Sequence, residues 1–202
     1  IEDVKFKSKN NFTLEIDKKL KVKNIILNSD LVIDKLKYER PEIIQSYISN
    51  TNDLILLEDH KLNLNYKKNN LIVSGEGKIQ LDEGINQIKY LINKKHEDLD
   101  IKTELFINNI NLKKQDFLKI YFPQMSEVIN FNDQKIKINY KNKDLTFFGS
   151  GKVKIDEDHD EIDYFFEKKE NSMNFKTELN LKNTIFKIDS INYKKKDETN
   201  MF

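Results

Sequence analysis

Several residue types are missing from this chain of 202 residues, and their absence narrows its function. It contains no cysteine, which excludes disulfides and thiolate metal sites but leaves the compartment open. Arg40 is the only arginine, and the formal net charge is only +1. Proteins that hold nucleic acid usually rely on arginine contacts and a strong positive field, so we expect no nucleic-acid binding.

Long apolar segments are also missing. No apolar run approaches the roughly 18 residues that a membrane-spanning helix needs. The hydrophobic fraction is only 38%, so either part of the chain is disordered or its apolar residues are concentrated on one face. The sequence opens at Ile1 without a signal-peptide pattern and stops just after a strand-like segment. We therefore expect it to be a piece of a longer protein.

A repeat of 74 residues is the strongest pattern present. Residues 75–105 and 149–179 align without a gap, and 13 of the 31 aligned pairs are identical. Self-similarity at a fixed spacing is typical of stacked structural units. We predict that residues 1–38 form the second half of a preceding repeat, that 39–118 form one repeat unit and that 119–202 form another, all within one continuous β-array.

Apolar and polar residues alternate within both copies, as in residues 61–66 (KLNLNY) and 135–140 (KIKINY). This alternation is typical of strands with one apolar and one polar face. Short polar turns favour antiparallel pairing between neighbouring strands. The predicted fold class is therefore all-β: an elongated antiparallel meander of tandem repeats, with about five strands each, that forms a curved groove with one apolar side. The segments after the two prolines, residues 42–49 and 124–130, are expected to be short helices or loops.

Four of the five glycines, Gly75, Gly77, Gly149 and Gly151, fall in the middle of predicted strands and on their apolar side. Glycine weakens a strand and often marks a bend or a bulge. We expect these glycines to let the long strands curve and to leave space on the inner face.

The apolar face of such a sheet needs a cover, which is a second sheet, a layer of helices or an apolar ligand. Helices are disfavoured, because the sequence has no amphipathic helical segment longer than about two turns. The aromatic residues suit either of the other covers, since they can contact acyl chains or fill the core of a sandwich. If the groove is open to lipid, its expected lining is Leu62, Leu64, Tyr66, Leu71, Val73, Ile79, Leu81, Ile88, Tyr90, Ile92, Leu99, Ile101, Leu105, Ile136, Ile138, Tyr140, Leu145, Phe147, Val153, Ile155, Ile162, Tyr164, Phe166, Met173, Phe175 and Leu179.

Residues 61–95 (KLNLNYKKNNLIVSGEGKIQLDEGINQIKYLINKK) and 135–169 (KIKINYKNKDLTFFGSGKVKIDEDHDEIDYFFEKK) resemble the AsmA-like proteins of Gram-negative envelopes, in particular the YhdP branch. The Thr-Glu-Leu sequence that follows each copy, and residues 191–194 (INYK), fit the same pattern. The resemblance implies a bridge-like periplasmic β-groove that carries phospholipid toward the outer membrane and supports its integrity. It also implies an inner-membrane anchor in parts of the full-length protein outside this sequence.

Signs of catalysis are lacking. The sequence has no Gly-x-Ser-x-Gly, P-loop or dinucleotide-binding motif, so we expect neither enzymatic activity nor a cofactor. His60, His96 and His159 all lie in polar, turn-like stretches, and a metal site would require them to converge. The acidic run at residues 156–161 is expected to be a solvated hairpin turn, because the other copy has Gly84, Ile85, Asn86 and Gln87 at the positions of residues 158–161.

Phospholipid acyl chains are thus the expected partner, bound passively along the apolar face. Thr103 and Thr177 fall on the apolar side, where a hydroxyl either touches a lipid headgroup or, as we favour, is satisfied locally. Two other classes remain. A structural or adhesive surface repeat protein made of closed β-sandwiches would have a dry core of its own, and a metal-dependent hydrolase would need a convergent cluster of histidine and carboxylate groups.

Overall fold

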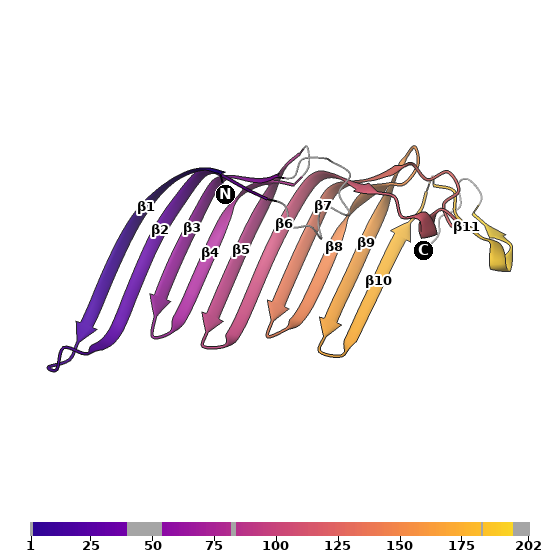
Figure 1. The fold of residues 1–202 in the computed structure, drawn as a ribbon. Coiled ribbons are helices and arrows are strands. Elements are labelled where there is room, and N and C mark those ends of the chain that lie inside the picture. The colour runs from indigo at the N-terminus through magenta and orange to yellow at the C-terminus, as the bar shows by residue number, and fades with distance from the viewer. Residues whose placement is uncertain (1, 40–53, 82–83, 183, 196–202) are drawn as a thin grey trace.

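Ten strands form one antiparallel sheet, in chain order from β1 to β10, in a computed structural model that describes residues 2–39, 54–81, 84–182 and 184–195 (Figure 1). The strands are β1 (Glu2–Ile16), β2 (Val22–Glu39), β3 (Leu54–Lys67), β4 (Asn70–Gln80), β5 (Ile85–Lys95), β6 (Asp98–Lys113), β7 (Val128–Lys141), β8 (Asp144–Lys154), β9 (His159–Lys169) and β10 (Ser172–Asn180). A small second sheet pairs β11 (Lys187–Ile188) with β12 (Tyr193–Lys194), and two 3-10 helices are present, η1 (Asp116–Leu118) and η2 (Asp189–Ile191).

The predicted all-β meander is confirmed. Each strand of the large sheet pairs with the next one in sequence, and β1 and β10 form its two edges. The described residues contain no α-helix, and none of their helices could cross a membrane. Short polar turns connect most neighbouring strands, as the alternation pattern indicated.

The strands follow the 74-residue spacing of the sequence. β7, β8 and β9 each begin and end 74 residues after β3, β4 and β5, and β10 begins 74 residues after β6. One period therefore holds four strands, whereas about five were expected. The strands are long, with 14, 11, 11 and 16 residues in β3–β6, so four of them fill most of a period. The predicted unit boundaries at residues 38/39 and 118/119 stay a prediction.

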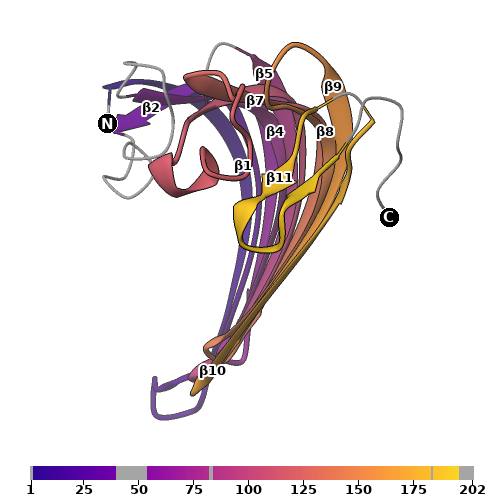
Figure 2. The ribbon, with the colours of Figure 1, turned by 90° about the vertical axis from the view of Figure 1, so that its right-hand side faces the viewer.

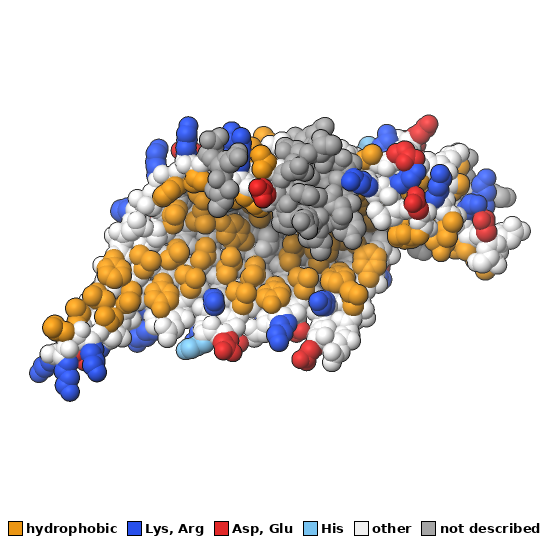
Figure 3. Space-filling model, in the orientation of Figure 1, with side chains coloured by type: hydrophobic (Ala, Val, Ile, Leu, Met, Phe, Trp, Pro, Cys, Tyr) orange, Lys and Arg blue, Asp and Glu red, His pale blue; other side chains and the backbone are white. Residues whose placement is uncertain are grey.

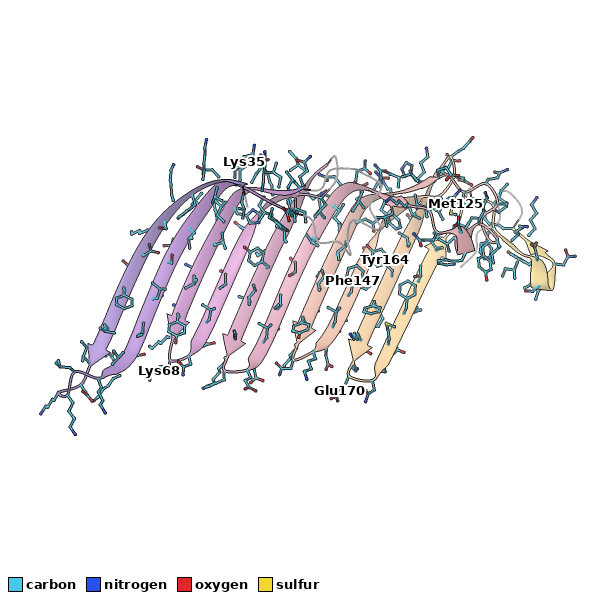
Figure 4. All side chains as sticks on the ribbon, in the orientation of Figure 1. Lys35, Lys68, Met125, Phe147, Tyr164 and Glu170 are labelled. Atoms are coloured by element: carbon cyan, nitrogen blue, oxygen red, sulfur yellow. The ribbon has the colours of Figure 1, made fainter. Side chains whose placement is uncertain are left out.

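The sheet is curved, and its strands bend over at one end so that one face is concave (Figure 2). β3 and β7 contain a β-bulge near this bend, at Asp59 and at Asp133, and both residues have a φ of 51°. A bulge adds an unpaired residue, which bends the strand and increases its twist. Lys35, which pairs with Glu58 beside the first bulge, lies at the bend (Figure 4).

A hydrophobic core fills the bent end of β7–β10 on the concave side. The cluster consists of Phe122, Met125, Ile129, Val153, Ile155, Ile162 and Leu181. Phe122 and Met125 come from the segment that contains η1, and Leu181 follows β10. This end of the apolar face is thus covered by the chain itself.

The two segments after the prolines have different outcomes. Residues 42–49 lie outside the described residues. Residues 124–127 form turns, and β7 begins at Val128, inside the range 124–130 where a helix or loop was expected. The short helix η1 precedes Pro123 instead of following it. The strand begins this early because Val128 and Ile129 pair with β6, and Phe131 pairs with both β6 and β8.

Candidate lipid-binding face

Apolar side chains form continuous rows across the concave face, at right angles to the chain direction. Each row is a series of cross-strand partners. The central row runs from β2 to β10 through Leu31, Leu62, Gly75, Tyr90, Thr103, Ile138, Phe147, Phe166 and Phe175. The next row toward the turns contains Ser29, Leu64, Val73, Ile92, Ile101, Tyr140, Leu145, Lys168 and Met173. Figure 3 shows these rows as a broad apolar band over the lower part of the strands.

The predicted lining residues share one side of the sheet but differ in exposure. Met173 and Phe175, on the edge strand β10, are each 71% exposed. Most of the others are partly exposed, which is the state expected of side chains on an uncovered sheet face. Five are buried: Ile79, Ile136, Val153, Ile155 and Ile162. The last three belong to the core at the bent end, so they pack against the protein's own segments instead of lining an open groove.

The opposite, convex face is mostly polar, with a few exposed apolar side chains such as Leu91 and Phe148. Lys61, Asn63 and Asn65 alternate along β3 with the apolar residues of the concave face, and all three are exposed. A cavity of about 650 Å³ lies on this face among residues that include Lys61, Lys78 and Lys89. Its many charged side chains make it unsuitable for an acyl chain, because burying a charge against hydrocarbon is costly.

The four mid-strand glycines make room for large side chains of neighbouring strands. A Cβ at Gly75 would fall on the ring of Tyr90, and one at Gly149 would fall on the ring of Tyr164. Gly77 and Gly151 lie in the same way beneath His60 and Gln134, respectively. The glycines thus leave space on the inner face, as expected, but aromatic, imidazole and amide groups of the neighbouring strands fill it.

Hydrogen bonds fix these side chains beside the bulge. Gln134 Nε2 donates to the carbonyls of Asn132, at 2.9 Å, and Lys152, at 2.8 Å. The hydroxyl of Tyr164 donates to Gln134 Oε1 at 3.0 Å, and burial raises the pKa of Tyr164 to about 12. Tyr164 also stacks on Phe147 at 5.4 Å between ring centroids, and both rings lie on the same side of the sheet (Figure 4). This cluster gives the face a rigid aromatic floor on β8 and β9.

The bend has buried polar groups at equivalent positions in the two periods. Asn86 Oδ1 accepts a hydrogen bond from the backbone N–H of Asn108 at 3.0 Å, and Asp160 Oδ1 accepts one from the N–H of Lys182 at 2.6 Å. Both side chains are at most 1% exposed. Their role is structural, since they satisfy backbone groups where the strand pairing is interrupted.

The prediction that Asp160 lies in a solvated turn is therefore wrong, although residues 156–158 do form the turn between β8 and β9. The backbone donor of Lys182 has no strand partner at the bend and draws the carboxylate inward. The burial of Asp160 was not evident from the sequence. Asn86, the equivalent residue in the other copy, is uncharged, so comparison of the two copies did not reveal a shared buried hydrogen-bond acceptor.

The three histidines do not form a site. His60 lies within β3 and is only 1% exposed, so its predicted place in a polar turn is wrong. The bulge at Asp59 directly precedes His60 and turns its side chain toward the concave face. His96 lies in the turn between β5 and β6, and His159 begins β9 with Nε2 at 3.0 Å from Asn132 Oδ1. Within the described ranges, no group of histidine and carboxylate residues could hold a metal ion.

His60 predicts a dependence of stability on pH. Burial lowers its pKa, because the charged imidazolium is poorly solvated there, and the Glu58 carbonyl 3.3 Å from Nδ1 opposes this only in part. The unfolded chain, with a histidine pKa of about 6.5, then binds the proton more readily than the folded protein. The free energy of unfolding should therefore fall as the pH drops below about 6.5 and level off below the folded-state pKa.

The variant His60→Gln isolates this effect, because glutamine already occupies the equivalent position at Gln134. Urea unfolding between about pH 7.5 and pH 5.5 should show a smaller loss of stability in His60→Gln than in the wild type. Equal losses in both proteins would show that His60 does not remain neutral in the fold.

In comparisons with protein-family models, with curated proteins and with solved structures, the chain matches none of them. The function of the chain is therefore inferred from its sequence pattern and from the geometry of the concave face.

The sequence pattern did not lead us to the bulges at Asp59 and Asp133. A signal is present in the second copy: the apolar residues of β7 change from odd positions, Ile129 and Phe131, to even positions from Ile136 onward. A change of parity within one strand is the expected sequence trace of an inserted residue.

Proposed function

We propose that this chain is a non-enzymatic segment of a lipid-transport protein, and that phospholipid acyl chains lie along its concave apolar face. The observation that carries the proposal is the central apolar row, which crosses the sheet from β2 to β10 without a charged side chain. Its members are partly exposed or exposed, apart from a glycine covered by a ring. A monomeric protein rarely leaves so continuous an apolar surface to water.

Passive contact supplies enough energy for this role. Burying one methylene group contributes about 0.8 kcal/mol, so a lipid tail needs apolar area and no particular residue. Strands lie about 4.8 Å apart, so the nine strands of the central row span roughly 38 Å. An acyl chain that moves along the row meets similar side chains at each strand, which keeps the barriers to its movement low.

We place the protein in the periplasm of a Gram-negative envelope, as an AsmA-like protein anchored to the inner membrane by parts outside this sequence. Residues 61–95 and 135–169, which carry that resemblance, form most of β3–β5 and β7–β9. An open, curved sheet with one apolar side is the architecture that the resemblance implies. In this setting, transport along the face would support the integrity of the outer membrane.

The core at the bent end favours a second candidate, a structural surface protein. Phe122, Met125 and Leu181 cover part of the apolar face with the protein's own residues. If further segments covered the remainder, the sheet would be half of a closed sandwich. The lipid proposal and this alternative differ in whether the lower part of the face is accessible to a ligand.

Native mass spectrometry of the purified protein distinguishes the two candidates. The lipid proposal predicts a bound phospholipid, which extraction and lipid analysis would identify. A protein without bound lipid, which also takes up none from added vesicles and does not bind an apolar dye, would overturn the proposal and favour the closed sandwich.

A further inference from the structure

Two lysines lie within the apolar pattern of the concave face, where the sequence alternation would place apolar residues. Lys94, near the end of β5, pairs with Leu71 on β4 and with Leu99 on β6. Lys168 occupies the equivalent place on β9, where it pairs with Leu145 on β8 and with Met173 on β10. They lie 74 residues apart and repeat the same arrangement.

The ammonium groups of Lys94 and Lys168 are available to a ligand. Both side chains are exposed, and neither forms an ion pair or a hydrogen bond with the described part of the chain. Lysines on the convex face differ among themselves: Lys152 is paired with Asp133 at 3.2 Å and Lys169 with Glu167 at 2.8 Å, whereas Lys61 and Lys89 have no ion pair with a described residue. Lys94 and Lys168 are distinguished by their place among the apolar side chains of the concave face.

Tyrosines accompany these lysines at the border of the apolar band. Tyr66 pairs with Leu71, and Tyr140 with Leu145, so each tyrosine is separated from a lysine by a single strand. Tyrosine and lysine both have an apolar body and a polar tip, a combination suited to the boundary between hydrocarbon and water. Figure 3 shows lysine side chains at the border between the apolar band and the strand turns.

We propose that this rim, defined by Tyr66, Lys94, Tyr140 and Lys168, binds the anionic headgroups of lipid molecules whose acyl chains lie on the concave face. The inference depends on the proposed function. Lysine recognises a phosphate or carboxylate as a point charge, and the adjacent apolar rows accept the hydrocarbon, so the ligand is an anionic membrane lipid. β5 and β9 are four strands apart, roughly 19 Å, so the two lysines hold separate headgroups.

Protection of a sheet edge does not account for these lysines. Lysine often blunts exposed edge strands, but β5 and β9 each have a partner on both sides. Solubility alone would place the charges on the convex face, where Lys95 and Lys169 already lie beside the same turns. A lysine on the apolar side can bind the charged headgroup of an amphiphilic ligand whose acyl chains contact the neighbouring apolar residues.

The test compares two double variants with equal loss of charge, Lys94→Gln/Lys168→Gln on the concave rim and Lys95→Gln/Lys169→Gln on the convex side. Binding is measured with a short-chain phosphatidylglycerol and a short-chain phosphatidylcholine below their micelle concentrations, with glycerol 3-phosphate as a headgroup lacking acyl chains. We expect the wild type and the convex variant to prefer phosphatidylglycerol. The rim variant should bind it about three- to tenfold more weakly, with phosphatidylcholine binding unchanged.

Each other outcome is decisive. Equal affinity of the wild type for both lipids, or equal losses in the two double variants, would overturn the headgroup site and leave the proposed function standing. Binding of glycerol 3-phosphate as strong as that of the lipid would show a free-anion site instead. If neither lipid bound the wild-type protein, the proposed function and the headgroup site would both be wrong.

Discussion

Replacing Gly149 with alanine should lower the midpoint of thermal unfolding by about 5–10 °C. The new methyl group would occupy the position of the Tyr164 ring. That ring cannot easily move, because its hydroxyl is hydrogen-bonded to Gln134 and the ring stacks on Phe147. Overpacking of a filled site costs about 1–3 kcal/mol, and the fixed ring favours the upper part of this range.

Gly84 provides the matched control. A Cβ there would meet its nearest neighbour, the Asn109 carbonyl oxygen, at an ordinary 3.4 Å, so Gly84→Ala should change the midpoint little. In a Tyr164→Ala background the obstacle is gone, and Gly149→Ala should then have almost no effect. A Gly149→Ala protein with the wild-type midpoint would show that the glycine is not needed for close packing.

Replacing Ile92 with glutamate should reduce the amount of bound lipid at least about tenfold. Ile92 lies in the middle of the concave face, between Val73 and Ile101. A carboxylate at this point removes apolar contact and would have to lose its water when an acyl chain covers it, a cost of several kcal/mol. The readout is the fraction of protein that carries lipid in native mass spectra.

Leu91→Glu is the control for this variant, since Leu91 is the preceding residue on β5. It faces the convex side between Ser74 and Lys102 and is 42% exposed. The same charge there should leave lipid binding unchanged, provided that circular dichroism shows both variants folded. Equal lipid loss in the two variants would indicate that net charge, and not the concave face, controls binding.

The alternation of residues such as Leu62, Leu64 and Tyr66 was enough to predict the strands, their antiparallel order and their apolar side, because side-chain direction alternates strictly along a strand. The core at the bent end could not be predicted in this way. Phe122 and Met125 lie in a segment without a regular pattern, and their contacts with Val153 and Ile162 depend on how the sheet bends. That bend depends on the bulges, and the local alternation of residues does not predict the direction or the size of the bend.

The glycines show the same limit in another form. Their position on the apolar side of β4 and β8 was evident from the sequence. The side chain that fills the space above each glycine comes from a neighbouring strand, which the sequence pattern does not identify. Gly75 is opposite Tyr90 in the register of β4 and β5, and the ring covers it. Sequence patterns give the side on which a residue lies, whereas the occupant of the space above a glycine is set by pairing across strands. In the same way, the alternation places Lys94 and Lys168 on the apolar side, but only the pairing of the strands shows that leucine and methionine side chains flank them.

Photocrosslinking from within β6 would show directly whether acyl chains lie on the concave face. The amino acid p-benzoyl-phenylalanine would be placed in β6 either at Ile101, on the concave side, or at the next residue, Lys102, on the convex side. After irradiation in cells, we expect a lipid adduct at position 101 and none at position 102. Equal adducts at both positions, or crosslinks at position 101 to protein alone, would contradict this expectation.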